Sequence, residues 1–350
     1  MRRIKLVAHL AGVSTATVSR VFSETVPVRP ATREKVLQAA EKVGYQPDAL
    51  ARALRVGSSK TIGLLLPNTA NHMVARLMTV IEDQVYRRGY RLIVCNTADD
   101  PERERIHLQE LVGRRVDGLI VSSSGVSARE YRIFLTEGTP IVALDRRCAD
   151  LRIDGAYPDN AGATFEAVSY LLRLGHCRIA AIGPRGTNIG RERFAGYHKA
   201  LATSGVIPDP RWQIELPEAR PDVEPPLRTL LNLPPGRRPS AIIALSYAYT
   251  QPLVGALRAL KLKVPDELSL VVYGDTGWNE LVDPPLTAVV YDGAILGGDA
   301  VELLFRRQRQ PRAPRKELMT PGRLVIGASC ACPAAGPFVS KCNRLHERTT

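Results

Sequence analysis

The sequence HLAGVSTATVSRVF, residues 9–22, joins a Gly-Val-Ser turn to a short helical segment whose outward positions are small. Val18, Val21 and Phe22 have helical spacing and predict one buried face. A helix that only covers a core usually carries long charged side chains on its wet face. Here the outward positions hold mainly Thr, Ala and Ser, with one arginine, Arg20. Such a face lets another molecule approach the helix backbone closely.

Two further helices are expected on either side of this segment. The spacing of apolar residues predicts one helix before the turn and another over residues 32–44. We expect Gly12 to end the first helix, because the residue after a helix often has a positive φ. Ser14 and Thr32 are expected to cap the second and third helices. Residues 1–46 therefore predict a small all-α head that contains a helix-turn-helix.

The positive charge of the chain is concentrated at its two ends. Of the net charge of +13, residues 1–60 contribute +7 and residues 306–350 contribute +8, which leaves a nearly neutral body. A basic module indicates a polyanionic partner, either nucleic acid or an anionic membrane surface. The alternative is a solvated basic surface that has no partner.

From Thr61 onward the pattern changes to an α/β core. Short runs of Leu and β-branched residues alternate with helical stretches of 10–20 residues, which predicts a parallel sheet covered on both faces. A second such series begins after Asp159 and Asn160. We therefore expect two doubly wound parallel-sheet subdomains that bind a ligand at the carboxyl ends of their strands, in the cleft between them.

The domain boundaries follow from these changes of pattern. The proline-rich segment 221–239 is expected to be a surface excursion, and the composition of the last residues predicts disorder. The expected units are a head (1–46), a hinge helix with linker (47–60), a first core subdomain (61–158 and 289–317), a second core subdomain (159–288 and 318–329) and a disordered tail (330–350).

Other classes of protein have little support in the sequence. The six cysteines include no CxxC pair and no histidine at zinc-finger spacing, so we expect reduced thiols, no metal and no cofactor. No apolar stretch approaches the roughly 20 residues of a membrane span, and no export signal is recognised, which predicts a cytoplasmic protein without a membrane partner. Doubly wound domains often host catalysis, but the GxSxG, GxxxxGK[ST] and GxGxxG motifs are missing. We expect no enzyme.

The small outward face of the second helix suits DNA. In a helix-turn-helix the second helix lies in the major groove with its first residues against the base edges, where long side chains would hold the backbone away. Arg20 can bind guanine O6 and N7 with both ends of its guanidinium. The alternative is an ordinary three-helix bundle with no partner. The predicted DNA contacts in the head are Ser14, Thr15, Ala16, Thr17, Ser19 and Arg20.

Three stretches carry a resemblance to a known family: LVAHLAGVSTATVSRVF (6–22), VPVRPATREKVLQAAEKVGYQPDALARALR (26–55) and TIGLLLPN (61–68). Together with looser similarity over residues 4–329, they resemble the lactose/galactose repressor (LacI/GalR) family of bacterial transcription factors. The resemblance implies a homodimeric repressor at the nucleoid that binds a pseudo-palindromic, double-stranded operator. It also implies a core like periplasmic binding proteins, which binds a small-molecule effector.

The same resemblance assigns roles to individual residues. Leu54, with Ala51 in the same hinge, matches the segment that enters the minor groove, where an apolar wedge can bend the duplex. Trp278 either stacks on the ligand or packs in the core. No leucine heptad follows the core, so a dimer is expected rather than a tetramer. The implied effector contacts are Asn71, Asp145, Arg146, Arg193, Ser246, Asp275 and Trp278.

The chain departs from the family pattern in the expected cleft. Ser246 and Tyr247 stand where the family usually has Asn-Asp, and Gly274 stands where it usually has Asp. With fewer acidic groups and two arginines, the cleft is expected to favour a sugar acid or phosphorylated sugar over a neutral hexose, unless the arginines are paired internally. The competing interpretation of the whole chain is a carbohydrate-binding transport protein without a DNA role, against which the basic head argues.

Overall fold

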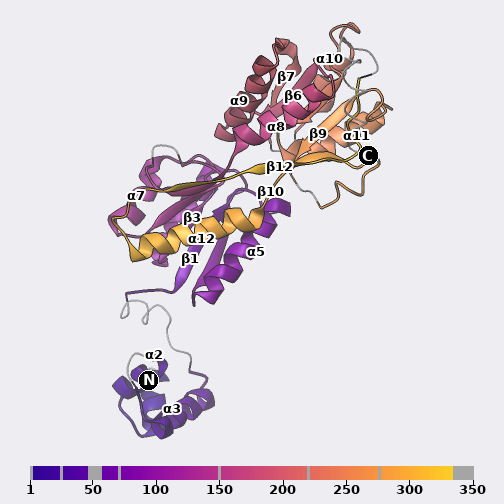
Figure 1. The fold of residues 1–350 in the computed structure, drawn as a ribbon. Helices are drawn as coiled ribbons and strands as arrows, with labels where there is room; N and C mark the ends of the chain where they lie inside the picture. Colours follow the sequence, from indigo (N-terminus) through magenta and orange to yellow (C-terminus); the bar gives the residue numbers. More distant parts are fainter. Residues whose placement is uncertain are drawn as a thin grey trace.

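The computed structural model describes residues 3–23, 27–45, 57–69, 72–148, 151–218, 221–274 and 277–333. These residues form a small helical head and a core of two α/β subdomains, which confirms the predicted fold class (Figure 1). The expected hinge helix falls within residues 47–56, which lie outside the described residues.

Three helices form the head around a core of valines and alanines. They are α1 (Arg3–Ala11), α2 (Thr15–Ser23) and α3 (Pro30–Lys42). Gly12 ends α1 with a φ of 66°, and the Ser14 hydroxyl accepts a hydrogen bond from the Thr17 N–H at 3.2 Å, as predicted. Thr32 does not cap α3, because that helix already begins at Pro30, whose fixed φ suits a first turn. Val18 and Val21 on α2 are buried against α1 and α3.

The first subdomain is a six-stranded parallel sheet in the order β11-β5-β4-β3-β1-β2. Its strands are β1 (Thr61–Leu66), β2 (Arg91–Asn96), β3 (Gly118–Val121), β4 (Ile141–Leu144), β5 (Asp154–Pro158) and β11 (Glu317–Thr320). One face is covered by α5 (His72–Arg87) and α12 (Gly293–Arg309), which lie side by side, and the other by α6 (Pro101–Gly113) and α7 (Ala128–Thr136). Strands β1, β3 and β4 are buried along almost their whole length, as a sheet covered on both faces requires.

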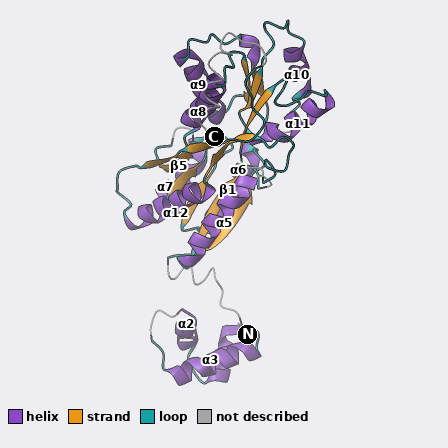
Figure 2. Ribbon diagram, turned by 45° about the vertical axis from the view of Figure 1, so that its right-hand side comes forward, coloured by secondary structure: helices purple, strands orange, loops and turns teal. Residues whose placement is uncertain are grey.

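The second subdomain repeats this plan in the order β12-β10-β9-β8-β6-β7, with β12 antiparallel at one edge (Figure 2). Its strands are β6 (Ile179–Pro184), β7 (Gln213–Leu216), β8 (Ala241–Ala244), β9 (Ser269–Tyr273), β10 (Thr287–Tyr291) and β12 (Gly322–Val325). The helices α8 (Asn160–Arg173) and α9 (Asn188–Thr203) cover one face, and α10 (Glu224–Leu231) and α11 (Thr250–Ala259) cover the other.

Within the described ranges, the chain crosses between the two sheets three times. The crossings follow β5, β10 and β11, so α12 returns to the first subdomain after a strand of the second. This corrects two expected boundaries. Residues 289–291 belong to the second sheet as part of β10, and residues 318–320 belong to the first sheet as part of β11. Sequence pattern alone could not separate adjacent apolar strands that join different sheets.

Two further expectations need correction. Segment 221–239 is not only a surface excursion, because it contains α10, whose Leu227 and Leu230 are buried in the second subdomain. The described part of the expected disordered tail is bound to the core: Ala331 accepts a hydrogen bond from His176, and Cys332 is disulfide-bonded rather than reduced. Residues 334–350 lie outside the described residues.

His176 holds this last segment against the second subdomain. Its Nδ1 lies 2.9 Å from the Ser240 hydroxyl, and its Nε2 lies 2.9 Å from the Ala331 carbonyl and 3.0 Å from the Ser269 hydroxyl. Because a carbonyl only accepts, Nε2 carries the proton and Nδ1 accepts from Ser240. The side chain is buried, and this burial lowers the pKa of His176 from 6.5 to about 4.

This lowered pKa predicts a pH dependence of stability. Between pH 6.5 and about 4 the unfolded chain binds a proton at His176 that the folded chain does not, so the free energy of unfolding falls as pH falls through that window. From pH 7.5 to pH 5 the loss should be about 2 kcal/mol. Denaturant unfolding of His176→Gln should lack this component, whereas His9→Gln, on the head surface, should retain it. Identical pH profiles for the native chain and His176→Gln would contradict the assignment.

Candidate functional site

The second helix of the head presents its small residues to solvent. Because Val18 and Val21 are fixed in the head core, the opposite side of α2 is turned outward. The predicted contacts fall into two groups: Ser14, Thr15, Ala16 and Arg20 are exposed, and Thr17 and Ser19 are half-buried. The surface combines short hydroxyl and methyl groups with one long cation, which is a composition able to approach base edges. The Ser14 hydroxyl caps α2, so its own DNA contact stays a prediction.

The hinge residues predicted to enter the minor groove, Ala51 and Leu54, lie outside the described residues. Their roles stay predictions.

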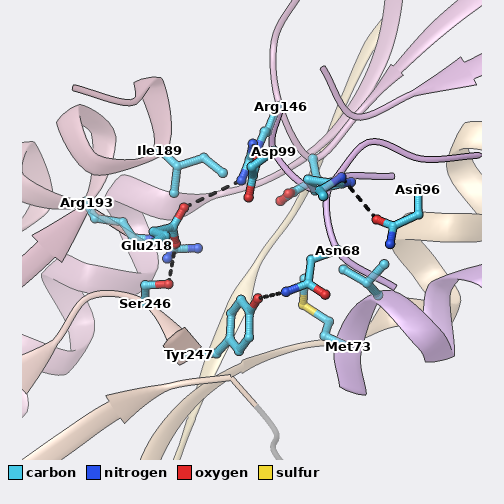
Figure 3. Close-up of a pocket in the computed structure, with 14 residues that line it drawn as sticks. Asn68, Met73, Asn96, Asp99, Arg146, Ile189, Arg193, Glu218, Ser246 and Tyr247 are labelled. Carbon is cyan, nitrogen blue, oxygen red and sulfur yellow. Dashed lines mark hydrogen bonds and ion pairs between the residues drawn. The ribbon is translucent and has the colours of Figure 1, made fainter. Parts of the chain in front are cut away.

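A cavity of about 240 Å³ lies between the two core subdomains (Figure 3). Residues after β1, β2 and β4 line it from the first subdomain, and residues of α9 and those after β7 and β8 line it from the second. The predicted location at the carboxyl ends of the strands is therefore confirmed. Four of the predicted ligand contacts line the cavity: Asp145, Arg146, Arg193 and Ser246.

Side chains of the two subdomains bind one another across this cavity. Arg146 forms an ion pair with Asp99 in its own subdomain and lies 3.5 Å from a carboxylate oxygen of Glu218 in the other. The Asn68 amide donates a hydrogen bond to the Tyr247 hydroxyl at 3.2 Å. Figure 3 shows these contacts converging on the cavity from both sides. Among the described residues, this ion pair and this hydrogen bond join the two subdomains across the cavity, and Arg147 forms a second ion pair between the subdomains with Glu192 of α9, at 3.6 Å.

Arg193 is largely committed to the second subdomain. Its Nε donates to the Asn160 amide oxygen at 2.9 Å, and one terminal nitrogen donates to the Leu245 carbonyl at 2.6 Å. The guanidinium also stacks over the Tyr273 ring at 4.2 Å. Because only 8% of the residue is exposed, Arg193 holds α8, α9 and β8 together as well as forming a wall of the cavity.

Asp145 faces the same cavity from the end of β4. Its φ of 62° is left-handed, a conformation that Asp adopts more readily than most residues. Burial raises the pKa of the Asp145 carboxyl, while the nearby Arg146 and Arg193 oppose that rise. A ligand that donates hydrogen bonds to this carboxylate would favour its charged form.

The two positions that depart from the family pattern, Tyr247 and Gly274, lie against each other. Gly274 has a φ of 91°, and a Cβ at this position would lie 2.9 Å from the Cβ of Tyr247. A real Cβ contact that short essentially never occurs, so this backbone leaves no room for a side chain at position 274. The contact is with the Cβ that any residue except glycine has at position 247, so it arises from the backbone and does not depend on the tyrosine ring.

The remaining predicted contacts are not placed in the cleft. Trp278 packs against the apolar core of the second subdomain and does not line the cavity, which favours the packing interpretation. Asn71 and Asp275 lie outside the described residues.

Sequence reasoning missed four polar residues of the cleft: Asn68, Asn96, Asp99 and Glu218. Asn68 and Asp99 follow recognised strands, so the rule about carboxyl ends could have found them. Glu218 follows β7, a four-residue strand that the sequence pattern did not identify.

Within the described ranges, no group of three or more His, Cys, Asp or Glu side chains is arranged to hold a metal ion. None of the helices described here is both long and apolar enough to cross a membrane.

Comparison with known proteins matches both parts of the chain. Residues 3–48 match "Bacterial regulatory proteins, lacI family", and residues 168–330 match "Periplasmic binding protein-like domain". An HTH-type transcriptional repressor PurR from Vibrio campbellii is 32% identical over 93% of this chain and 98% of its own, and one from Histophilus somni is 32% identical over 88% and 92%.

The chain belongs to the LacI family. Among solved LacI-family structures, the lac repressor dimer bound to operator and the anti-inducer ONPF has a TM-score of 0.78 at 26% identity, covering 93% of this chain and 98% of that one. The regulator CelR in complex with cellobiose has a TM-score of 0.69 at 26% identity, covering 93% and 99%. The chain is accordingly a DNA-binding transcriptional regulator and not an enzyme. The alternative of a transport protein without a DNA role is wrong.

The exposed Arg20 on α2 allows a prediction about base recognition. Arg20→Ala should weaken binding to an operator selected from random DNA by roughly 1–3 kcal/mol per half-site, because a bidentate contact to guanine is lost. Competition titrations should show unchanged affinity for random DNA and an unchanged salt dependence, since the phosphate contacts remain. The exposed residue Arg33 on α3 offers a control of equal charge, through Arg33→Ala. Equal losses on selected and random DNA for Arg20→Ala would refute base readout by this residue.

Proposed function

We propose that this LacI-family chain is a homodimeric repressor that binds a pseudo-palindromic operator and responds to a small sugar in its cleft. The observation that carries the proposal is the combination of an exposed, small-residue α2 with a polar cavity between two subdomains. A single head reads only one half-site, so two heads related by a two-fold axis favour a two-fold operator. The protein would act where its operator lies, at the bacterial nucleoid in the cytoplasm.

The ligands seen in related structures favour a sugar. The LacI-family regulator from Enterococcus faecium, 26% identical with a TM-score of 0.69, contains ribose, and CelR contains cellobiose. Three carboxylates and two asparagines in the cavity of the present chain offer hydrogen-bond partners for hydroxyl groups, and Met73 and Val74 offer an apolar wall. The lining therefore combines polar groups that can orient a sugar with a surface for its ring.

The charges of the described lining favour a neutral sugar over a sugar acid. The sequence argument for an anionic ligand assumed that the cleft had lost acidic groups. Asp99 and Glu218 restore them, and both pair with Arg146. Arg146 is paired with these two carboxylates, and Arg193 already donates to Asn160 and Leu245, which leaves fewer of its N–H groups for an incoming anion. The carboxylates of Asp99, Asp145 and Glu218 outnumber the two guanidiniums.

A ligand screen tests this charge argument. In thermal unfolding of the full chain, a panel of neutral pentoses, hexoses and disaccharides should raise Tm, and the matching sugar acids should raise it less, because they meet excess negative charge. Glu218→Gln removes one carboxylate and one half of the bridge to Arg146. It should therefore improve the relative binding of the acids.

The control is Glu110→Gln, an exposed carboxylate on α6, which should leave the ranking of the panel unchanged. Stabilisation by sugar acids alone would overturn the preference for a neutral ligand. A sugar that binds but leaves operator affinity unchanged would contradict its role as the effector.

A further inference from the structure

The described end of the linker is tied to the core by one carboxylate, that of Asp117. One oxygen of Asp117 accepts hydrogen bonds from the N–H and the hydroxyl of Ser59, at 2.8 and 3.1 Å. The other accepts the Ser58 hydroxyl and, at 3.1 Å, the Lys60 N–H. Four donors from three consecutive residues thus converge on one side chain, which immediately precedes β3.

Apolar packing contributes little to this attachment. Gly57 and Lys60 are exposed, Ser58 and Ser59 are half-buried, and Gly57 and Ser58 line an open cavity of about 600 Å³. The Lys60 ammonium lies 4.5 Å from the centre of the Tyr90 ring, which adds one further contact. The position of the linker on the core therefore depends mainly on hydrogen bonds to Asp117, which are strong because the acceptor is charged.

Asp117 also connects the linker to α12. The Gln308 amide near the end of α12 donates to the Asp117 carbonyl at 2.9 Å. Its neighbour Arg307 binds the buried Asp154 of β5 through two hydrogen bonds of 2.9 and 2.8 Å, so this end of α12 is held firmly. The other end of α12 begins directly after β10, at a crossing between the subdomains. One helix about 25 Å long thus joins that crossing to the linker anchor.

We propose that Asp117 is a positioning residue for DNA binding: it fixes the linker to the first subdomain, so that the core sets where each head is presented. This inference rests on the proposed dimeric operator binding. When the linker start is fixed, the two heads of a dimer meet half-sites at one spacing. When it is released, two more residues of each linker, Ser58 and Ser59, become free and the heads accept several spacings, whereas the Lys60 carbonyl still accepts a hydrogen bond from the Arg91 N–H at 2.8 Å.

The test uses the full chain and a set of operators with different central spacers. An operator is first selected from random DNA by the native chain, and then one or two base pairs are added to or removed from its centre. The native chain should show a sharp spacing preference. Asp117→Ala should bind the parent operator about tenfold more weakly and should bind all spacings within about threefold of one another. Asp117→Asn, which keeps one accepting oxygen, should fall between them.

Two further variants separate positioning from folding. Ser58→Ala combined with Ser59→Ala removes two donors without altering the core, and it should flatten the spacing profile with no change in Tm. Glu110→Ala, an exposed carboxylate of the same subdomain, should keep the native profile. A sharp native preference that persists in both Asp117→Ala and the double serine variant would overturn this inference. A native chain without any preferred spacing would instead contradict the proposed dimeric binding.

Discussion

The three crossings of the chain between the two sheets are the constraint on which the rest of the structure depends. Because each sheet is completed by a strand from the far end of the chain, neither subdomain is a continuous segment, and the two are joined at the carboxyl ends of their strands. The cleft therefore lies beside the connections that must bend when it opens or closes. Arg146 with Glu218 and Asn68 with Tyr247 bridge the cleft and stabilise one arrangement of these connections.

Much of the fold could be predicted because it depends on local pattern. Nearby residues determine the helical spacing of Val18 and Val21 and the turn at Gly12. The same holds for the alternation of strands and helices after Thr61. The exchange of β10 and β11 between the sheets could not be predicted, because both strands are short and only pairing with distant partners decides their place. Strand β7 was not predicted, because a strand of four residues is too short to show a clear pattern of apolar residues.

The ligand site was predicted in location but not in charge. Resemblance to the family and the rule about strand ends indicated Asp145, Arg146, Arg193 and Ser246, which all line the cavity. Which charges remain for a ligand depends on internal pairing, such as that of Arg146 with Asp99 and Glu218, and no sequence pattern reports it. The close approach of residue 247, which leaves no room for a side chain at Gly274, is likewise visible only in three dimensions. The role of the small residues of α2 could be predicted from the sequence alone, because it depends only on their being exposed.

The central claim is that ligand in the cleft and operator at the heads are coupled through the first subdomain. Coupling of this kind is reciprocal, so titration calorimetry of the full chain offers the most direct test. The neutral sugar that stabilises the chain most should change operator affinity by roughly fivefold or more, and operator should change the affinity for that sugar by the same factor in the same direction. A factor of one in both titrations would show that the cleft and the heads act independently and would contradict the account.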